Sequence, residues 1–148
     1  MRLQNMKRSE ETEQIRVATW AEHAIPRYPE LRWLYHVPNE GKRTNGEILR
    51  AMGLKRGVSD LCLPYPKGCY VGAYIEMKFG HNRPSKEQTE FMVDMDRAGH
   101  FVCICYSAEA AIDVLCRYLE LPKNHVFMVN SMEGREVRRD VHGIPVIA

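Results

Sequence analysis

Two short apolar runs that carry charged residues constrain the fold of this chain most. The first, residues 59–63, contains Asp60, and the second, residues 74–78, contains Glu76 and Lys78. Residues two apart in a β-strand lie on the same face of a sheet, so a strand places Glu76 beside Lys78. Burial of an unpaired carboxylate or ammonium group is costly. If Asp60 lies on the same face, the side chains of Asp60, Glu76 and Lys78 form one cluster of charges.

The length and composition are those of one ordinary domain. The chain has 148 residues, of which 45% are hydrophobic and 27% are charged, and a domain of this size needs no disulfide or zinc site for stability. Its net charge of +2 does not imply nucleic-acid binding by itself. Basic residues nevertheless gather in the sequence around the carboxylates, although each also fits an ordinary solvated surface. They are Lys42, Arg43, Arg50, Lys55, Arg56, Lys78, His81, Arg83 and Lys86.

The cysteines and the apolar segments indicate a protein of the reducing cytoplasm. Five cysteines without a C-x-x-C pair fit neither a disulfide framework nor a zinc site. The N-terminus has no signal peptide, and no apolar segment is long enough to cross a membrane. We therefore expect a protein without a membrane partner.

Hydrophobic periodicity and turn signals predict an α/β domain with a mixed central sheet flanked by helices. Ser9, Ser85 and Ser107 are candidate helix N-caps. The predicted helices span residues 9–23, 45–52, 85–97 and 108–119, and the predicted strands span residues 31–37, 58–63, 70–78 and 101–106. Residues 1–8 form a basic arm, residues 9–121 the domain, and residues 122–148 a C-terminal extension.

Asp60, Glu76 and Lys78 are the residues best suited to carry chemistry. Two carboxylates and a backbone carbonyl, that of Met77 or Ile75, are hard oxygen ligands for a divalent cation. Such a cation polarises a phosphate and activates water, and Lys78 could orient that water or stabilise negative charge. This is the chemistry of phosphodiester hydrolysis. Taken alone, a Glu-x-Lys pair also fits a surface ion pair in an unrelated α/β protein.

Three further groups are weaker candidates. Glu10 and Gln14 lie on one face of the first predicted helix, where an acidic residue commonly interacts with the helix dipole, and Glu13 is an equally plausible carboxylate. Ser85 and Gln88 form a capping box that could also direct Gln88 towards Lys78. The turn at residues 39–43, with Asn39, Lys42 and Arg43, could present backbone amides and cations to a phosphate.

Several ordered blocks resemble the VRR-NUC domain of the PD-(D/E)XK nuclease superfamily. The blocks are residues 38–41, 53–61, 74–78, 85–88 and 98–100, followed by Glu109-Ala110 and Tyr118-Leu119. The resemblance covers about residues 9–120, and the chain is similar to the small stand-alone form found in bacteriophages and bacteria. It implies a restriction-endonuclease-like core and an endonuclease that cleaves DNA, with Holliday or other branched junctions as substrates. It also implies a homodimer that uses Mg²⁺ or Mn²⁺.

The resemblance assigns roles to individual residues. Asp60 and Glu76 match the metal-binding carboxylates and Lys78 matches the catalytic lysine. Gln88 matches the glutamine that follows this strand, and Glu10 matches the carboxylate of the first helix, with Glu13 as the alternative. Together with the carbonyl of Met77, the implied metal ligands are Glu10, Asp60 and Glu76. The residues expected to contact DNA are Asn39, Lys42, Arg43, Lys55, Arg56, Arg83 and Lys86.

Two features depart from the family pattern. Ser59 stands where the family has proline before the aspartate, and we expect activity to survive because proline there mainly fixes the backbone. Residues 122–148 have no counterpart, so they could add a strand, support a dimer or contact nucleic acid through Arg135, Arg138 and Arg139. The main alternative to a nuclease is a non-catalytic module that binds branched DNA on the same fold.

Overall fold

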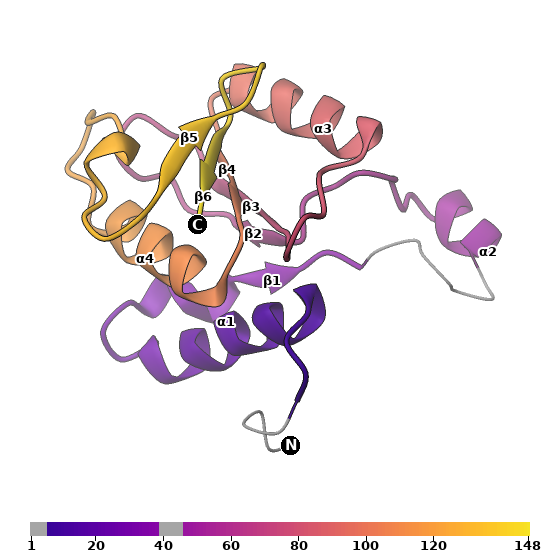
Figure 1. Ribbon diagram of the computed structural model, residues 1–148, viewed down its shortest axis with the longest axis horizontal. Helices are drawn as coiled ribbons and strands as arrows, with labels where there is room; N and C mark the ends of the chain where they lie inside the picture. The colour runs from indigo at the N-terminus through magenta and orange to yellow at the C-terminus, as the bar shows by residue number, and fades with distance from the viewer. Residues whose placement is uncertain (1–5, 39–45) are drawn as a thin grey trace.

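The computed structural model describes residues 6–38 and 46–148. A six-stranded sheet with the order β1-β2-β3-β4-β6-β5 forms its centre (Figure 1). The pairs β1–β2, β2–β3 and β6–β5 are antiparallel, whereas β3–β4 and β4–β6 are parallel. The strands are β1 (Tyr35–His36), β2 (Leu61–Leu63), β3 (Ala73–Met77), β4 (Phe101–Cys105), β5 (Val137–Arg139) and β6 (Pro145–Ile147). The predicted mixed α/β sheet is confirmed.

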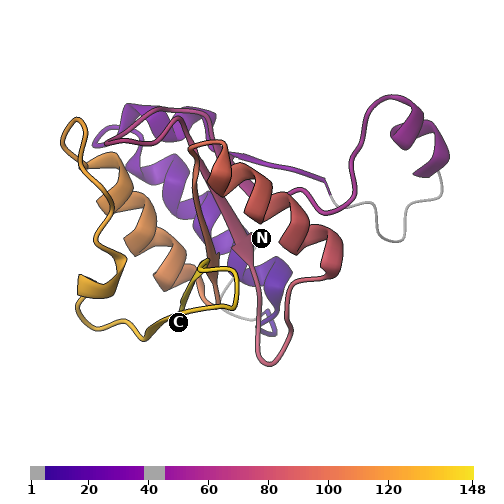
Figure 2. The ribbon, with the colours of Figure 1, turned by 90° about the horizontal axis from the view of Figure 1, so that it is seen from above.

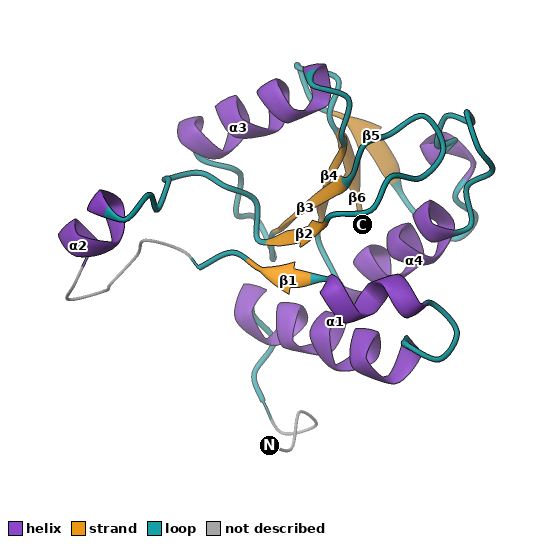
Figure 3. Cartoon of the chain, turned by 180° about the vertical axis from the view of Figure 1, so that it is seen from behind, coloured by secondary structure: helices purple, strands orange, loops and turns teal. Residues whose placement is uncertain are grey.

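Helices cover both faces of this sheet. They are α1 (Glu10–Ala24), α2 (Gly46–Ala51), α3 (Lys86–Arg97) and α4 (Ala108–Leu119). Helices α1 and α4 lie on one face and α3 lies on the other, while α2 stands away from the sheet (Figures 2 and 3). Ser9, Ser85 and Ser107 each accept a hydrogen bond from a backbone N–H in the first turn, as predicted for N-caps.

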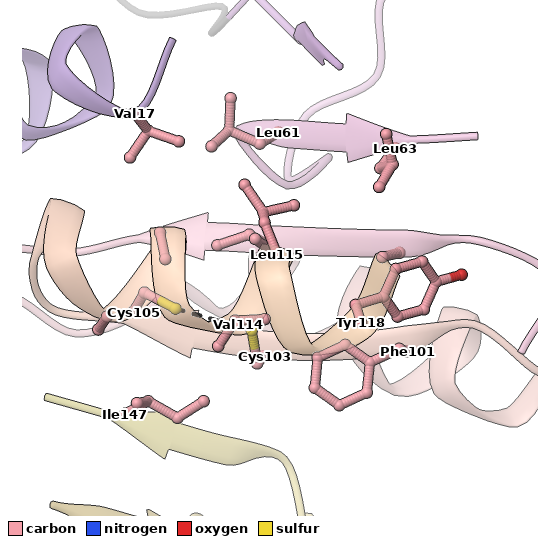
Figure 4. Packing of buried hydrophobic residues seen from close by; sticks show 14 of the residues in the cluster. Val17, Leu61, Leu63, Phe101, Cys103, Cys105, Val114, Leu115, Tyr118 and Ile147 are labelled. Atoms are coloured by element: carbon pink, nitrogen blue, oxygen red, sulfur yellow. Dashed lines mark hydrogen bonds between the residues drawn. The ribbon is translucent and has the colours of Figure 1, made fainter. Parts of the chain in front are cut away.

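The strict alternation of side chains along the strands divides the core into two clusters. Ile75 and Met77 of β3 belong to the larger cluster beneath α1 and α4, together with Leu61, Cys103 and Leu115 (Figure 4). The smaller cluster beneath α3 is formed by Met92, Val102, Ile104, Ile144 and Val146. Glu76 is flanked in β3 by Ile75 and Met77, so its side chain lies on the α3 face.

The first predicted strand, residues 31–37, is largely wrong. Residues Pro29–Trp33 form a 3-10 helix, and only Tyr35–His36 pair with β2. Pro29 has the backbone conformation that suits the start of a helix, and the turn buries Leu31 while leaving Trp33 exposed. An apolar run that follows a proline therefore forms a helical turn here instead of a strand.

The C-terminal extension completes the sheet. Strand β6 pairs with β4 through Ile104↔Val146 and Cys105↔Ile147, and β5 pairs with β6 at the edge. Phe127 of this segment stacks on Phe101 with ring centroids 4.7 Å apart. Three roles were considered for residues 122–148, and the structure shows one of them: this segment adds two strands to the sheet.

Candidate active site

Asp60, Glu76 and Lys78 meet at one end of the sheet. Asp60 directly precedes β2, Glu76 lies near the end of β3, and Lys78 directly follows β3. Because these strands are antiparallel and Leu61 pairs with Ile75, the start of β2 lies beside the end of β3. One Asp60 carboxylate oxygen accepts a 2.8 Å hydrogen bond from the backbone N–H of Met77. The Lys78 ammonium lies 3.5 Å from Glu76 Oε1.

Glu76 is fully buried, which is unusual for a carboxylate. Neither of its carboxylate oxygens has a hydrogen-bond partner among the described residues, although Lys78 is close. Burial and the neighbouring charge of Asp60 raise the pKa of Glu76 to about 9. Burial also raises the pKa of Asp60, against the opposing effect of the Met77 N–H. In the protein without a bound cation, Glu76 therefore keeps its proton at neutral pH.

Glu10, at the start of α1, completes the group of charged side chains. Its Oε1 lies 3.4 Å from the Lys78 ammonium, and its Oε2 accepts a 2.8 Å hydrogen bond from the Asn82 side chain. The Ser9 cap fixes where the helix begins and therefore where Glu10 is held. Lys78 thus interacts with carboxylates from both α1 and β3.

Glu13, the alternative carboxylate, has a different set of partners. It is fully buried, and its Oε1 lies 2.7 Å from Arg8 and accepts a 3.4 Å hydrogen bond from the N–H of Ala108. Its Oε2 lies 3.1 Å from Arg16. Burial acts to raise the pKa of Glu13, but these bonds outweigh it and hold the pKa below its ordinary value. Glu13 therefore links α1 to α4, whereas Glu10 faces Lys78.

Gln88 acts as part of the predicted capping box. Its side-chain oxygen accepts a 2.8 Å hydrogen bond from the backbone N–H of Ser85, and its own N–H donates to the Ser85 hydroxyl. The backbone between Glu87 and Gln88 packs against Gly57, three residues before Asp60. The cap thus places α3 beside the segment that leads to Asp60, and a direct role for Gln88 in chemistry stays a prediction.

Two polar residues outside the predicted set of site residues support the site. His36 Nδ1 lies 2.7 Å from the Gln14 side-chain nitrogen and 3.2 Å from the carbonyl of Asp60, so it joins α1 to the backbone before β2. Asn82 binds Glu10 across 72 residues of sequence. Only the polarity of residues 81–82 in the loop after Lys78 hinted at such a contact.

The predicted DNA-binding residues fall into two groups. Lys55, Arg56, Arg83 and Lys86 are exposed. Lys55 and Arg56 directly precede Gly57, whose contact with Glu87 brings them close to Lys86 at the start of α3. Lys86 lies 4.0 Å from Glu90, one turn further along the helix. Asn39, Lys42 and Arg43 lie outside the described residues.

The donor atoms suit a hard divalent cation, although no complete metal site is formed in advance. Within residues 6–38 and 46–148, no three His, Cys, Asp or Glu side chains are arranged as a metal-binding group. Asp60, the buried Glu76 carboxylate without hydrogen bonds and the adjacent Met77 carbonyl are nevertheless all oxygen donors. Glu10 could join them only by exchanging its contact with Lys78.

Comparisons with known proteins agree with this fold. A family model described as "VRR-NUC domain" matches residues 9–109. A solved structure described as "VRR_NUC domain protein" superposes with a TM-score of 0.66 and 22% sequence identity, over 80% of this chain and 93% of that one. At this identity the structural likeness shows the fold alone. No curated protein matches the chain.

Among the described residues, the helices are too short or too polar to cross a membrane.

Proposed function

The chain belongs to the VRR-NUC family, and from this premise we propose that it is a divalent-metal-dependent endonuclease that hydrolyses phosphodiester bonds in DNA. The observation that carries the proposal is the meeting of Asp60, Glu76 and Lys78 at one end of the sheet. The strongest part of this observation is Glu76, because its buried carboxylate has no hydrogen-bond partner among the described residues. Burial of this kind destabilises a fold, so its presence favours a functional role.

Asp60, Glu76 and the Met77 carbonyl would hold Mg²⁺ or Mn²⁺. When bound, the cation would polarise the scissile phosphate and lower the pKa of a water molecule. Lys78 would orient the attacking water or stabilise negative charge on the phosphate. Glu10 holds the Lys78 ammonium from the α1 side, and Asn82 holds Glu10. Gln88 would contribute through its position at the start of α3.

Branched DNA is the proposed substrate, and a homodimer is the proposed active form. Both follow from the similarity to the small stand-alone members of the family. A symmetric dimer would place two active sites on opposite strands of a junction. Two exposed apolar side chains, Ile48 of α2 and Met52 directly after it, are available for such an interface, and no residue of this helix is buried.

The test is a cleavage panel with labelled four-way junction, flap and linear duplex DNA, in Mg²⁺, in Mn²⁺ and in EDTA. The proposal predicts cleavage that requires the cation and is lost in Lys78→Met and Glu76→Gln. Lys67→Met is the matched control, since Lys67 also forms a partly buried ion pair, 3.1 Å from Glu30, outside the cluster. If no DNA in the panel is cut with either cation, the proposal fails. Light scattering of the purified chain tests the dimer separately.

One observation favours a second candidate, a non-catalytic module that binds branched DNA. Lys78 contacts both Glu10 and Glu76, so an ammonium group already occupies the place beside Glu76 where a cation would bind. In that case the protein would bind the labelled junction equally well in EDTA and in Mn²⁺, and the junction would not be cleaved. The same panel, read as binding and as cleavage, separates the two candidates.

A further inference from the structure

A cavity of about 510 Å³ lies where the parallel strands end. The loop after β3 contributes His81 and Arg83, and Tyr106 follows β4. Glu136, directly before β5, Arg138 of β5 and Val146 of β6 also line it. The carboxyl ends of parallel strands are a common place for ligand sites in α/β proteins. The lining residues of the C-terminal segment, among them Arg138, lie beyond the part of the chain that matches the family model.

The cavity and the catalytic group share one face of the sheet. Glu76 pairs with Ile104, Ile104 with Val146, and Val146 with Arg138. These four residues form one row across four strands, and their side chains lie on the same face. At about 4.8 Å between strands, Arg138 is roughly 14 Å from Glu76. A DNA strand that places its scissile phosphate at Glu76 could therefore reach the cavity within a few nucleotides.

The loop between the cavity and the catalytic group is held at Asn82 by two contacts. The Tyr106 hydroxyl donates a 2.6 Å hydrogen bond to the backbone carbonyl of Asn82. The side chain of the same asparagine donates to Glu10, which contacts Lys78. Residues that line the cavity are thus connected to the proposed active site through a short series of contacts.

The three arginines of the C-terminal extension have different surroundings. Arg135 lies 3.5 Å from Asp113, and Arg139 donates a 2.8 Å hydrogen bond to the carbonyl of Gly143. The Arg138 side chain is exposed at the cavity and forms no hydrogen bond or ion pair with the residues that the structure describes. Arg83 adds a second guanidinium group to the same cavity, and Glu136 is the one acidic side chain among its lining residues in the described part of the chain.

We propose that this cavity binds the sugar–phosphate backbone of the DNA strand that passes through the proposed active site. Arg138 and Arg83 would contact a phosphate within a few nucleotides of the scissile one, because guanidinium groups match phosphate oxygens in charge and geometry. Tyr106 would supply an aromatic contact for a nucleotide. The inference rests on the proposed nuclease function, and it gives the C-terminal extension a role in substrate binding.

The test measures binding without cleavage, by fluorescence anisotropy of a labelled duplex and of a labelled single strand in EDTA. Arg138→Gln should weaken binding about three- to tenfold and reduce the slope of log affinity against log salt by about one. Glu136→Gln should tighten binding, because it removes a negative charge from the cavity. Arg117→Gln is the charge-matched control, since Arg117 lies on α4 beside Asp113, on the opposite face of the sheet. Thermal unfolding verifies that each variant is folded.

The outcomes separate this inference from the function on which it rests. Equal affinities and salt slopes for Arg138→Gln and Arg117→Gln would overturn the cavity assignment, even if the unmodified protein cleaves DNA. A loss of affinity confined to Arg138→Gln would support it, even if no cleavage is seen. In an active enzyme, the Arg138 variant should have a higher KM and a nearly unchanged kcat. A fall in kcat alone would contradict a role in binding.

Discussion

Glu10 and Glu13 lie one turn apart on α1, but their surroundings give them opposite consequences on substitution. Glu10→Gln should abolish cleavage with little change in stability, because its half-exposed carboxylate contacts Lys78 and Asn82. Glu13→Gln should lower the free energy of unfolding by about 1–3 kcal/mol, because it weakens the buried contacts with Arg8, Arg16 and Ala108. Urea unfolding and the cleavage assay, run on both variants, check this pair. Comparable losses of stability would contradict the assignment.

Glu76 should make the metal-free protein less stable as pH rises. Its pKa is about 9 in the folded protein and near the ordinary 4.5 in the unfolded chain. Stability is therefore full below about pH 4.5 and is lost progressively as pH rises through about 9, because only the unfolded chain releases the proton easily. Glu76→Gln should remove this contribution and be more stable than the unmodified protein at pH 8 by at least roughly 2 kcal/mol.

Unfolding in urea with EDTA, at pH 5 and at pH 8, measures this effect. Mn²⁺ should stabilise the unmodified protein at pH 8, since a cation compensates the buried charge, and it should stabilise Glu76→Gln far less. The expectation is contradicted if the two proteins have parallel stability curves over this pH range.

The connection between Gly57 and α3 shows how one element positions the site. Gly57 has φ of +92°, and an added Cβ would lie 2.5 Å from the carbonyl carbon and oxygen of Glu87. Gly57→Ala should therefore cost at least about 2 kcal/mol and reduce cleavage, because it pushes α3 away from the segment that leads to Asp60. Gly53→Ala is the control. Gly53 also has positive φ, +108°, but a Cβ there would meet no atom within 4 Å. Thermal unfolding of the two variants should differ clearly, and equal melting temperatures would show that the close contact is unimportant.

At the same scale, local sequence signals predicted the helices better than the strands. The serine caps and the apolar spacing of α4 are contained within each segment, so the structure confirms them. Strands β5 and β6 carry no comparable signal, since each has three residues and is stabilised by pairing with distant segments. The prediction of a strand at residues 31–37 was wrong because the backbone geometry of Pro29 outweighed the strand propensity of the residues after it. The proximity of Glu76 and Lys78 was predictable from their spacing, whereas the place of Asp60 depends on how β2 pairs with β3. The contact of Asn82 with Glu10 depends on how α1 packs.

For the whole molecule, the sheet itself determines where the domain ends. The family model matches residues 9–109, yet β6 pairs with β4 and contributes Ile147 to the core. A chain that ends at residue 121 would lose this pairing and the stack of Phe127 on Phe101. It would also leave the buried strand β4 as an open edge, which favours aggregation. We expect this chain to lose cooperative unfolding, as measured by circular dichroism during heating.

A point substitution tests whether the fold depends on residues 122–148 without removing them. Ile147→Ala should lower the free energy of unfolding by about 2–5 kcal/mol, because Ile147 is fully buried beside Cys105. Val141→Ala, at a position that is 94% exposed in the turn between β5 and β6, should change it by less than about 0.5 kcal/mol. If the shortened chain unfolded cooperatively at the same temperature as the full chain, residues 122–148 would be an accessory to the sheet. Since β6 supplies the parallel neighbour of β4, we expect Glu76 to be held in place only when residues 122–148 are present.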